Sequence, residues 1–378
     1  MLEVRVKTAK HNDQKDGHDS GINRELVTGR VMMSPKKGDL VKHRFFALTV
    51  IVMAVISLES PPAAAMAQAR PSSPGTSKTW TPPKTPSGDP DLQGVWSTTT
   101  TAPLERPAQF GERRFLTDEE HAARVRQLEN QRETDGQETS ANERASTGPP
   151  AHWTDRATQV SRQTSLVVEP PDGRVPVIAA AEAKRDYDLA HATDAFEHMS
   201  PWDRCITRGM PGGMFPGGYG NVYQIVQAPG YVAILMEMIH ETRVIPLDNR
   251  PRLNARQWNG DSRGHWEGNT LVVETTNYNN KGWIATNVAS GRIKGIPQSE
   301  ALRVVERFTR VDANTIQYEI TIEDPNVYTR PWKVSFPMNL DPKAQLFEYA
   351  CHEGNHAMTN MLSGARAVEK AAEEAARK

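Results

Sequence analysis

The second half of the chain alternates apolar and polar side chains with a period of two. In residues 315–323, Ile316, Tyr318 and Ile320 share one face, while Gln317 and Glu319 share the other. Such alternation is typical of a strand in a sheet with one buried and one solvated side. The same pattern predicts further strands at residues 164–169, 270–277, 302–311, 331–338 and 346–351.

Residues 221–248 form the longest apolar-rich run outside the N-terminal leader. An Ala-Pro-Gly turn at residues 228–230 interrupts this run, and its residues are largely β-branched, aromatic or aliphatic. This combination predicts a hairpin deep in the sheet. If the alternation continues, His240 stands with Met236 and Met238 on one face. The opposite face then carries charged side chains that can pair with one another: Glu237, Glu241 and Arg243.

Roughly nine to eleven strands with short turns between them predict a mainly β protein, an antiparallel β-barrel or a strongly curved sheet. A few short helices are expected beside it. Thr117 and Glu120 form a capping box, which predicts a helix to about Gln131, and residues 179–189 predict a second helix.

The N-terminal region has the pattern of a secretory signal peptide. Basic residues between 36 and 44 precede an apolar run at residues 45–58, and Ala65-Met66-Ala67 supplies an A-x-A cleavage site. The apolar run is shorter than the roughly 20 residues of a spanning helix, and no later run reaches that length. We therefore expect a periplasmic or extracellular protein without a membrane span in its mature chain. The polar residues before Met32 suggest that the true start is Met32 or Met33.

Composition divides the 378 residues into four parts. Residues 1–67 form the leader, and residues 68–90 a mobile linker rich in Pro, Ser and Thr. A single β-rich domain is expected at residues 91–364, with a disordered loop near residues 133–152. Residues 365–378 form a polar, Ala-rich helical tail or a fraying end.

Charge and cysteine usage narrow the class of protein. The net charge is −1 and there is no dense basic face, so nucleic acid is not an expected partner. Cys205 and Cys351 both follow the cleavage site, and in an oxidising compartment two cysteines most simply form one disulfide. Two buried free thiols, or one reactive thiol, are the alternatives. The oligomeric state is left open.

Several strings of residues carry a resemblance. PDLQGVWS, YQIVQAPGYVAILMEMIHETRVIPLD, GHWEGNTLVVETTNYN and ACHEGN resemble a widespread family of secreted bacterial proteins of unknown function, over residues 91 to about 367. The resemblance implies export and a β-rich, calycin- or lipocalin-like fold, but no catalytic residues. Gly94-Val95-Trp96 matches the G-x-W that opens the first strand of lipocalin-like barrels, where the Trp closes one end.

His352-Glu353-Gly354-Asn355-His356 matches the H-E-x-x-H pattern of zinc proteases. That chemistry needs both histidines on one helix face, but Gly354-Asn355 is a helix-stopping pair that follows a predicted strand. The resembling family also often has an aromatic residue in place of His356. We therefore predict no metal and no cofactor, and interpret the segment as a structural turn or as an acid/base pair of His352 and Glu353.

Two loops are further candidates for a site. Residues 261–266 combine Asp261, Arg263 and Trp266 in what is predicted to be a loop between strands, at a barrel mouth. The Gly-rich stretch 203–221 must be a loop that turns tightly or approaches a ligand closely, and it lacks the pattern of a phosphate-binding P-loop. A disulfide from Cys205 would bring Arg204 of this loop close to His352 and Glu353.

The leading functional hypothesis is an exported protein that binds a small apolar or aromatic molecule in a largely apolar pocket. Met236, Met238, Trp266 and Trp332 would supply the walls, and His240, Arg204, Asp261, Arg263 and His352 the polar contacts. The first alternative is a hydrolase or lyase on the same scaffold, with His240 or His352 as base and Glu353 or Asp261 as its partner. The second is an extracellular interaction module without a pocket.

Overall fold

The computed structural model describes residues 80–135 and 154–377, which all belong to one compact unit. The predicted signal peptide and most of the predicted disordered loop lie outside the described residues. Residues 133–135 of that loop are helical. The end of the predicted linker is ordered as well. Residues 80–90 form a turn in which the Thr85 amide donates to the Asp89 carbonyl at 2.9 Å, and the Gln227 side chain donates to the Pro90 carbonyl at 3.0 Å.

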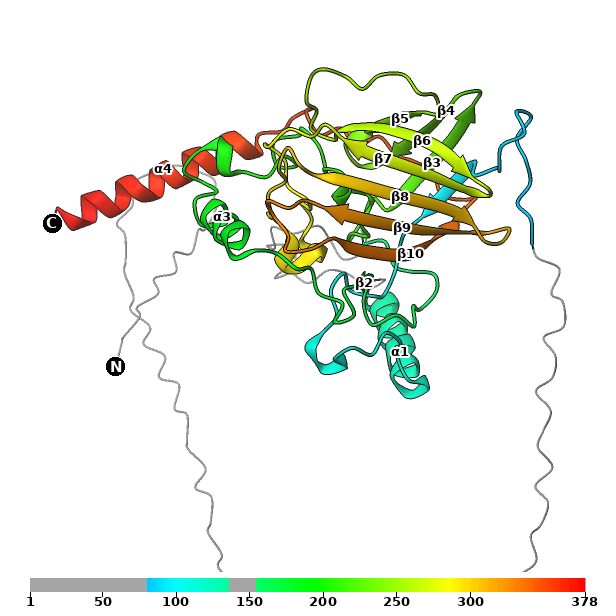
Figure 1. Cartoon of the computed structure of the whole chain (residues 1–378). Coiled ribbons are helices and arrows are strands. Elements are labelled where there is room, and N and C mark those ends of the chain that lie inside the picture. Colours follow the sequence, from blue (N-terminus) through cyan, green and yellow to red (C-terminus); the bar gives the residue numbers. More distant parts are fainter. Residues whose placement is uncertain (1–79, 136–153, 378) are drawn as a thin grey trace, which may run out of the picture. The chain divides into compact units, whose positions relative to one another are not determined.

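Antiparallel pairing joins all the strands into one strongly curved sheet (Figure 1). Along the sheet the order is β5-β4-β3-β1-β10-β9-β8-β7-β6, and β2 pairs with β10 beside this path. The strands are β1 (Gly94–Ser97), β2 (Val167–Glu169), β3 (Val222–Ala228), β4 (Tyr231–Met236), β5 (Thr242–Pro246), β6 (Asp261–Glu267), β7 (Thr270–Thr276), β8 (Arg303–Arg310), β9 (Thr315–Glu323) and β10 (Trp332–Leu340).

The two ends of this path, β5 and β6, come side by side and nearly close the sheet into a barrel. A Cβ atom on Gly264 of β6 would lie 2.8 Å from Leu247 and 2.9 Å from Ile245. Only glycine therefore permits the strands to approach so closely. The predicted fold class, a mainly antiparallel β-barrel or strongly curved sheet of calycin-like type, is confirmed.

A buried ion pair spans the nearly closed side of the barrel. The Arg243 guanidinium on β5 donates to both carboxylate oxygens of Glu306 on β8, at 3.0 and 2.6 Å. Arg243 also donates to the Ser262 hydroxyl at 3.3 Å, and the Tyr318 hydroxyl donates to Glu306. Burial by itself lowers the pKa of Arg243, but the adjoining Glu306 carboxylate more than offsets this and raises it overall.

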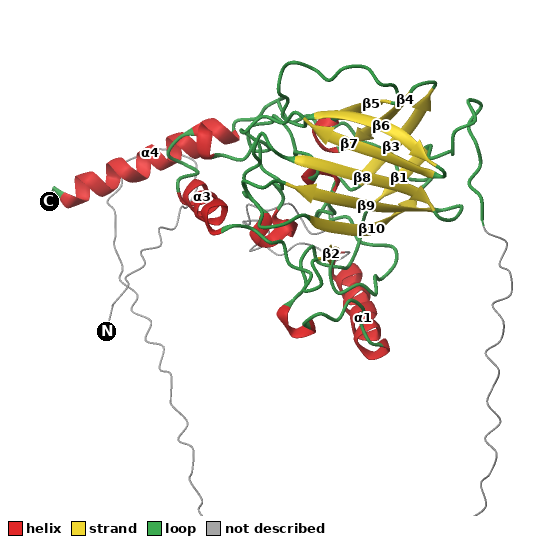
Figure 2. Ribbon diagram, viewed as in Figure 1, coloured by secondary structure: helices red, strands yellow, loops and turns green. Residues whose placement is uncertain are grey.

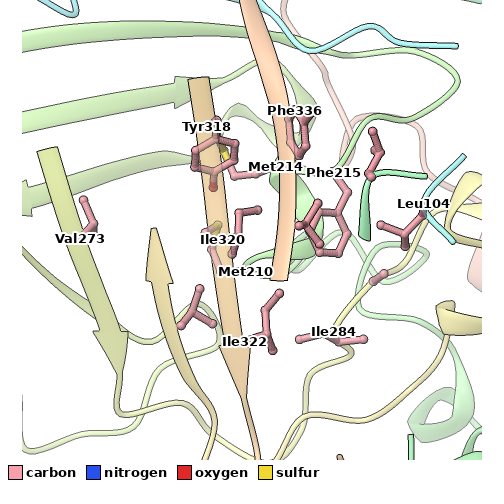
Figure 3. Close-up of a cluster of buried hydrophobic side chains, with 14 of the residues drawn as sticks. Leu104, Met210, Met214, Phe215, Val273, Ile284, Tyr318, Ile320, Ile322 and Phe336 are labelled. Atoms are coloured by element: carbon pink, nitrogen blue, oxygen red, sulfur yellow. The ribbon is translucent and has the colours of Figure 1, made fainter. Parts of the chain in front are cut away.

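Apolar side chains fill the interior of the barrel. Figure 3 shows Tyr318 and Ile320 of β9 and Phe336 of β10 close to Met214 and Phe215 from the Gly-rich loop. All of these side chains are at most 3% exposed. The predicted inward face of β9 is thereby confirmed. Because the interior is filled, a ligand site has to be sought at the ends of the strands.

The α-helices of the described residues lie outside the sheet (Figure 2), whereas the 3-10 turn that carries Met214 reaches into the core. They are α1 (Asp118–Asp135), α3 (Ala179–Ala190) and α4 (Ala357–Ala376), with short 3-10 turns η1 (Ala108–Phe110), η3 (Phe196–His198), η4 (Gly212–Met214), η5 (Met238–His240) and η6 (Val288–Ile293). The capping box is confirmed: the Glu120 amide donates to the Thr117 hydroxyl at 3.2 Å, and the Thr117 amide donates to the Glu120 carboxylate at 2.8 Å. In the described parts of the chain, no helix is long and apolar enough to cross a membrane.

Three local predictions were wrong. The hairpin run does not continue as a strand through His240, because η5 interrupts it with Ile239 and His240 at positive φ. Residues 261–266 are not a loop but most of strand β6, which pairs along its length with β7. Residues 346–351 form no strand despite their alternation, because they extend along the surface beyond β10 without a partner strand.

Candidate functional site

A cleft of about 1270 Å³ lies at one end of the barrel. One wall is an extended segment, residues 341–350, which we call the strap. The other walls come from the end of β1, the ends of β3 and β4, and the Gly-rich loop. The lining residues are Ser97, Thr99, Thr154, Asp155, Arg156, Thr158, Tyr219, Gly220, Val222, Glu237, Met238, Asp341, Lys343, Ala344, Gln345, Phe347, Glu348 and Tyr349.

The strap is fastened to the rest of the fold at both ends. At its start, the Asp341 amide donates to the Val95 carbonyl of β1 at 2.9 Å. Just past its other end, Cys351 forms a disulfide with Cys205 of the Gly-rich loop, so the predicted pairing is confirmed. Because both of its ends are held, the strap forms a fixed wall of the cleft. We call this cleft the strap cleft.

Apolar side chains cover much of the strap cleft. Phe347 of the strap is 65% exposed, although phenylalanine is usually buried. Met238, on the opposite wall, is only 4% exposed. Gly220 lies at φ +68° with its Cβ position 2.3 Å from the sulfur of Met238, so any larger residue would displace that methionine. The Gly-rich loop and Met238 therefore form one closely packed wall of the cleft, which the exposed Phe347 also lines.

The polar part of the strap cleft is formed by several kinds of side chain. It includes the carboxylates Asp155, Glu237, Asp341 and Glu348, the cations Arg156 and Lys343, and the tyrosines Tyr219 and Tyr349. Asp155 accepts hydrogen bonds from the Asn221 amide at 3.1 Å and from the Asn221 side chain at 3.0 Å. Burial, together with the charge of Asp155, raises the pKa of Glu237, and the Phe347 amide opposes this shift. Burial, with the neighbouring Tyr349, raises the pKa of Tyr219 to about 12. At neutral pH, Tyr219 is therefore a neutral hydroxyl able to donate or accept a hydrogen bond.

Replacing Glu237 with glutamine is expected to make the stability of the protein less dependent on pH. The folded pKa of Glu237 is above its unfolded value of 4.5, so its ionisation destabilises the fold as pH rises from about that value. The variant should therefore unfold at a higher temperature than the parent protein at pH 7, and at the same temperature at pH 3.5. Thermal unfolding measured across this pH range tests the prediction. Glu353→Gln, which changes an exposed carboxylate, is the control and should show no such gain; an equal gain at both pH values would contradict our assignment.

Of the side chains proposed from sequence, Met238 lines the strap cleft. His240 is exposed at the end of η5, so the predicted placement of this histidine on a methionine-rich face is wrong. The reason is local: the 3-10 turn shifts the side-chain alternation, so that Met238 points inward and His240 outward. Met236 is buried in the core and does not face the cleft.

The HEGNH segment is an exposed turn rather than a helix face. His352, Glu353 and His356 are all exposed, Gly354 has φ +66°, and α4 begins only at Ala357. The two histidines consequently do not share a turn of helix, as a zinc-protease site would require. Over the described residues, no group of three or more His, Cys, Asp or Glu side chains is arranged to hold a metal ion.

The remaining candidates lie in β6 and the core. Asp261 forms an ion pair with Arg263 and accepts a hydrogen bond from the Leu253 amide at 2.8 Å. Trp266 packs partly buried against the core. Trp332 is 1% exposed, with its ring centroid 6.2 Å from that of Phe215. These residues stabilise the barrel and are not among those that line the strap cleft.

Arg204 forms no hydrogen bond or ion pair with His352 or Glu353, although the disulfide joins their segments. Its guanidinium instead lies over the rings of Phe196 and Trp258, 5.4 and 5.8 Å from their centroids. Sequence reasoning missed the main polar and aromatic residues of the cleft, Asp155, Tyr219, Phe347 and Tyr349. The one signal that pointed toward them was the glycine content of residues 203–221, which marked a loop that approaches a ligand or another segment closely.

Comparison of the chain with family models, with curated proteins and with solved structures finds no match in any of the three.

Proposed function

We propose that this chain is an exported protein that binds a small molecule with an apolar or aromatic body in the strap cleft. The observation that carries the proposal is the exposed side chain of Phe347, which lines the same cleft as Met238, Val222 and the Gly-rich loop. An aromatic ring that stays open to water in a concave site gains most when an apolar ligand covers it. Export rests on the N-terminal pattern, and the resemblance to a secreted family supports it.

The polar groups of the strap cleft indicate what the ligand carries at one end. Glu237 and Asp155 are two carboxylates close enough for one to raise the pKa of the other. A ligand that places a hydrogen-bond donor or a positive charge between them would relieve this repulsion. We therefore propose a ligand with an apolar body and a donor group, such as an amine, that is held by Glu237 while its body contacts Phe347.

The size of the cleft fits a small molecule. Its volume, about 1270 Å³, exceeds the roughly 300–1,000 Å³ of common ligand pockets. The ligand should therefore leave part of the cleft to water. The walls are also largely in place before binding, because the disulfide and the Asp341 hydrogen bond hold both ends of the strap. Little ordering is then needed on binding, which favours affinity.

Titration with N-phenyl-1-naphthylamine, an uncharged aromatic fluorophore, tests the apolar part of this proposal. We expect saturable binding at one site, and Phe347→Ala should weaken it about three- to tenfold, since one aromatic contact contributes about 0.5–1.5 kcal/mol. Because Phe347 is exposed, its removal should leave thermal stability unchanged. Phe115→Ala removes a similarly exposed ring, 59% exposed, outside the strap cleft and should bind the dye as the parent does.

Two results would contradict the proposal. Dye binding that is absent or does not saturate would remove the apolar site, and equal affinities of the Phe347→Ala and Phe115→Ala variants would place it elsewhere. Native mass spectrometry of the exported protein adds a direct check. A small molecule bound to the parent protein should be lost, together with dye binding, when Phe347 is replaced by alanine. The residues of the hydrolase or lyase hypothesis, His240, His352, Glu353 and Asp261, do not line the strap cleft. That hypothesis and the interaction-module hypothesis stay predictions.

A further inference from the structure

A second, smaller hollow borders the Gly-rich loop. It has a volume of about 200 Å³ and is lined by Thr100, Thr101, Ala102, Pro103, Leu104, Leu166, Phe215, Pro216, Gly217, Ala289 and Ser290. A single water molecule takes about 30 Å³. The hollow, which we call the Gly217 cavity, is thus large enough for a small ion or the end group of a larger molecule.

Arg208 is a buried cation that forms no ion pair with any described residue, although the charge of the Asp203 carboxylate acts on it from beyond ion-pair distance. Its side chain is 6% exposed, it takes part in none of the ion pairs, and its Nη1 atom has no hydrogen-bond partner. The guanidinium lies over the ring of Trp202, 4.3 Å from the centroid. Arginine stays charged in proteins, and a buried charge without a partner is strongly unfavourable. The stacked Trp202 ring offsets only part of this cost.

Asn287 carries a second unpaired donor, which lies near Gly217 as the Arg208 guanidinium does. Its Oδ1 accepts a hydrogen bond from the Ser290 amide at 3.2 Å, whereas its Nδ2 is buried without a partner. A Cβ atom on Gly217 would lie 3.4 Å from this Nδ2 and 3.6 Å from the Nη2 of Arg208. The space that a side chain at Gly217 would take is therefore bordered by both donors and by the Tyr219 carbonyl oxygen, 3.6 Å away. Arg208 and Asn287 lie beside Gly217 but are not among the residues that line the Gly217 cavity itself.

The wall of the Gly217 cavity adds a third group of the same kind. The Ser290 hydroxyl is buried, lines the cavity and has no hydrogen-bond partner. The loop that carries Gly217 is held in position, because its amide donates to the Asn221 side chain at 2.7 Å and its carbonyl accepts from that side chain at 3.1 Å. Arg208, Asn287 and Ser290, which lie around Gly217, each therefore have a buried donor without an acceptor. Among these three side chains, Arg208 carries a positive charge.

We propose that a small oxyanion, a carboxylate or a phosphate group, binds at Gly217 between Arg208 and Asn287. Its oxygens would accept from the guanidinium, from the Asn287 amide and from the Ser290 hydroxyl, which satisfies the three donors and neutralises the buried charge. Guanidinium groups bind carboxylate and phosphate through paired hydrogen bonds and are common wherever such groups are recognised. This site is separate from the strap cleft and does not depend on its proposed ligand.

The experiment uses the full chain after dialysis into buffer free of oxyanions. Inorganic phosphate and acetate are titrated in separate arms at constant ionic strength, with heat of binding and the thermal unfolding midpoint as readouts. We expect one saturable site and a rise in midpoint in at least one arm, because a ligand that binds only the folded state stabilises it. The arm that saturates at the lower concentration identifies the group as phosphate-like or carboxylate-like.

Gly217→Ala and Asn287→Asp test the location with little change to the fold. At Gly217 a methyl group makes only ordinary contacts, at 3.4 Å or more, yet it occupies the space between the two nitrogens, so affinity should fall at least tenfold. Asn287→Asp keeps the oxygen that accepts from the Ser290 amide and replaces the unpaired donor with a negative charge. This variant should unfold at a higher temperature than the parent in oxyanion-free buffer, and its response to added anion should disappear.

Arg256→Met is the matched control, because it removes an exposed arginine that pairs with Glu300 and should leave anion binding unchanged. The proposal is overturned if neither anion gives a saturable response with the parent protein. It is equally overturned if Gly217→Ala and Asn287→Asp bind as the parent does, or if Arg256→Met weakens binding as much as they do. A lower midpoint of Asn287→Asp in oxyanion-free buffer would show that Arg208 does not lack an anion there.

Discussion

Glu306→Gln is expected to destabilise the folded protein by about 3–5 kcal/mol, the cost typical of breaking a buried ion pair by removing one partner. Glu306 is 0% exposed and Arg243 is 7% exposed, so water cannot replace the lost carboxylate. The amide of glutamine can still accept one hydrogen bond from Arg243, but it leaves the guanidinium charge uncompensated in the barrel interior. Chemical denaturation of the variant and the parent protein measures the difference.

The double variant Arg243→Met with Glu306→Leu separates the cost of an unpaired charge from the contribution of the pair. Replacing both partners by apolar residues is often nearly neutral, so the double variant should recover most of the loss. Arg303→Met provides a surface comparison, since Arg303 pairs with Glu274 at 2.6 Å and with Glu323 at 3.6 Å and all three side chains are exposed. Its removal should cost less than about 1 kcal/mol per pair. If Glu306→Gln has the same free energy of unfolding as Arg303→Met, the buried ion pair stabilises the barrel no more than a surface pair does.

Removal of the disulfide has the second large expected effect. Cys205 and Cys351 are 146 residues apart in sequence, and in the chain-entropy model closing a loop of this length stabilises the fold by up to about 5 kcal/mol. The variant Cys205→Ser with Cys351→Ser should therefore lose about 2–5 kcal/mol in chemical denaturation. It should also bind the fluorophore more weakly, because one end of the strap is released from the Gly-rich loop.

Reductant provides the control for this prediction. Dithiothreitol should lower the stability of the parent protein toward that of the double serine variant, and should leave the variant itself unchanged. If the serine variant keeps both its stability and its dye affinity, the disulfide neither stabilises the fold nor holds the wall of the strap cleft.

Most of the strands could be predicted from the chain itself. Residues 315–323 were expected as a strand, and β9 has those bounds. The predicted strand 270–277 is one residue longer than β7 at its C-terminal end, and the predicted strand 302–311 is one residue longer than β8 at each end. A side-chain period of two is imposed by the strand backbone and by the sheet's two faces, so it is visible without knowing the partner strands. The capping box at Thr117 is likewise a local hydrogen-bond pattern, and it was predicted for the same reason.

Prediction from the local pattern failed where a neighbouring strand decides whether a segment becomes part of the sheet. Residues 346–351 alternate as β9 does, but no strand lies beside them to accept their hydrogen bonds. Residues 261–266 contain a glycine and charged side chains typical of a loop, yet they form β6, because Gly264 permits the close approach of β5. His240 was misplaced by a single 3-10 turn, which changed the phase of the alternation.

Local pattern thus determined that this protein is a mainly β structure with an antiparallel sheet, and that Cys205 and Cys351 are suited to pair. Tertiary structure alone decided where a ligand could bind. The strap cleft brings together Ser97, Asp155, Tyr219, Glu237 and Phe347, from five separate segments. Likewise, Arg208 and Asn287 meet beside Gly217, which lines a cavity together with Ser290. The physical reason is that alternation and capping depend on neighbours along the chain, whereas a cavity and an unpaired buried charge depend on which distant segments exclude water from one another.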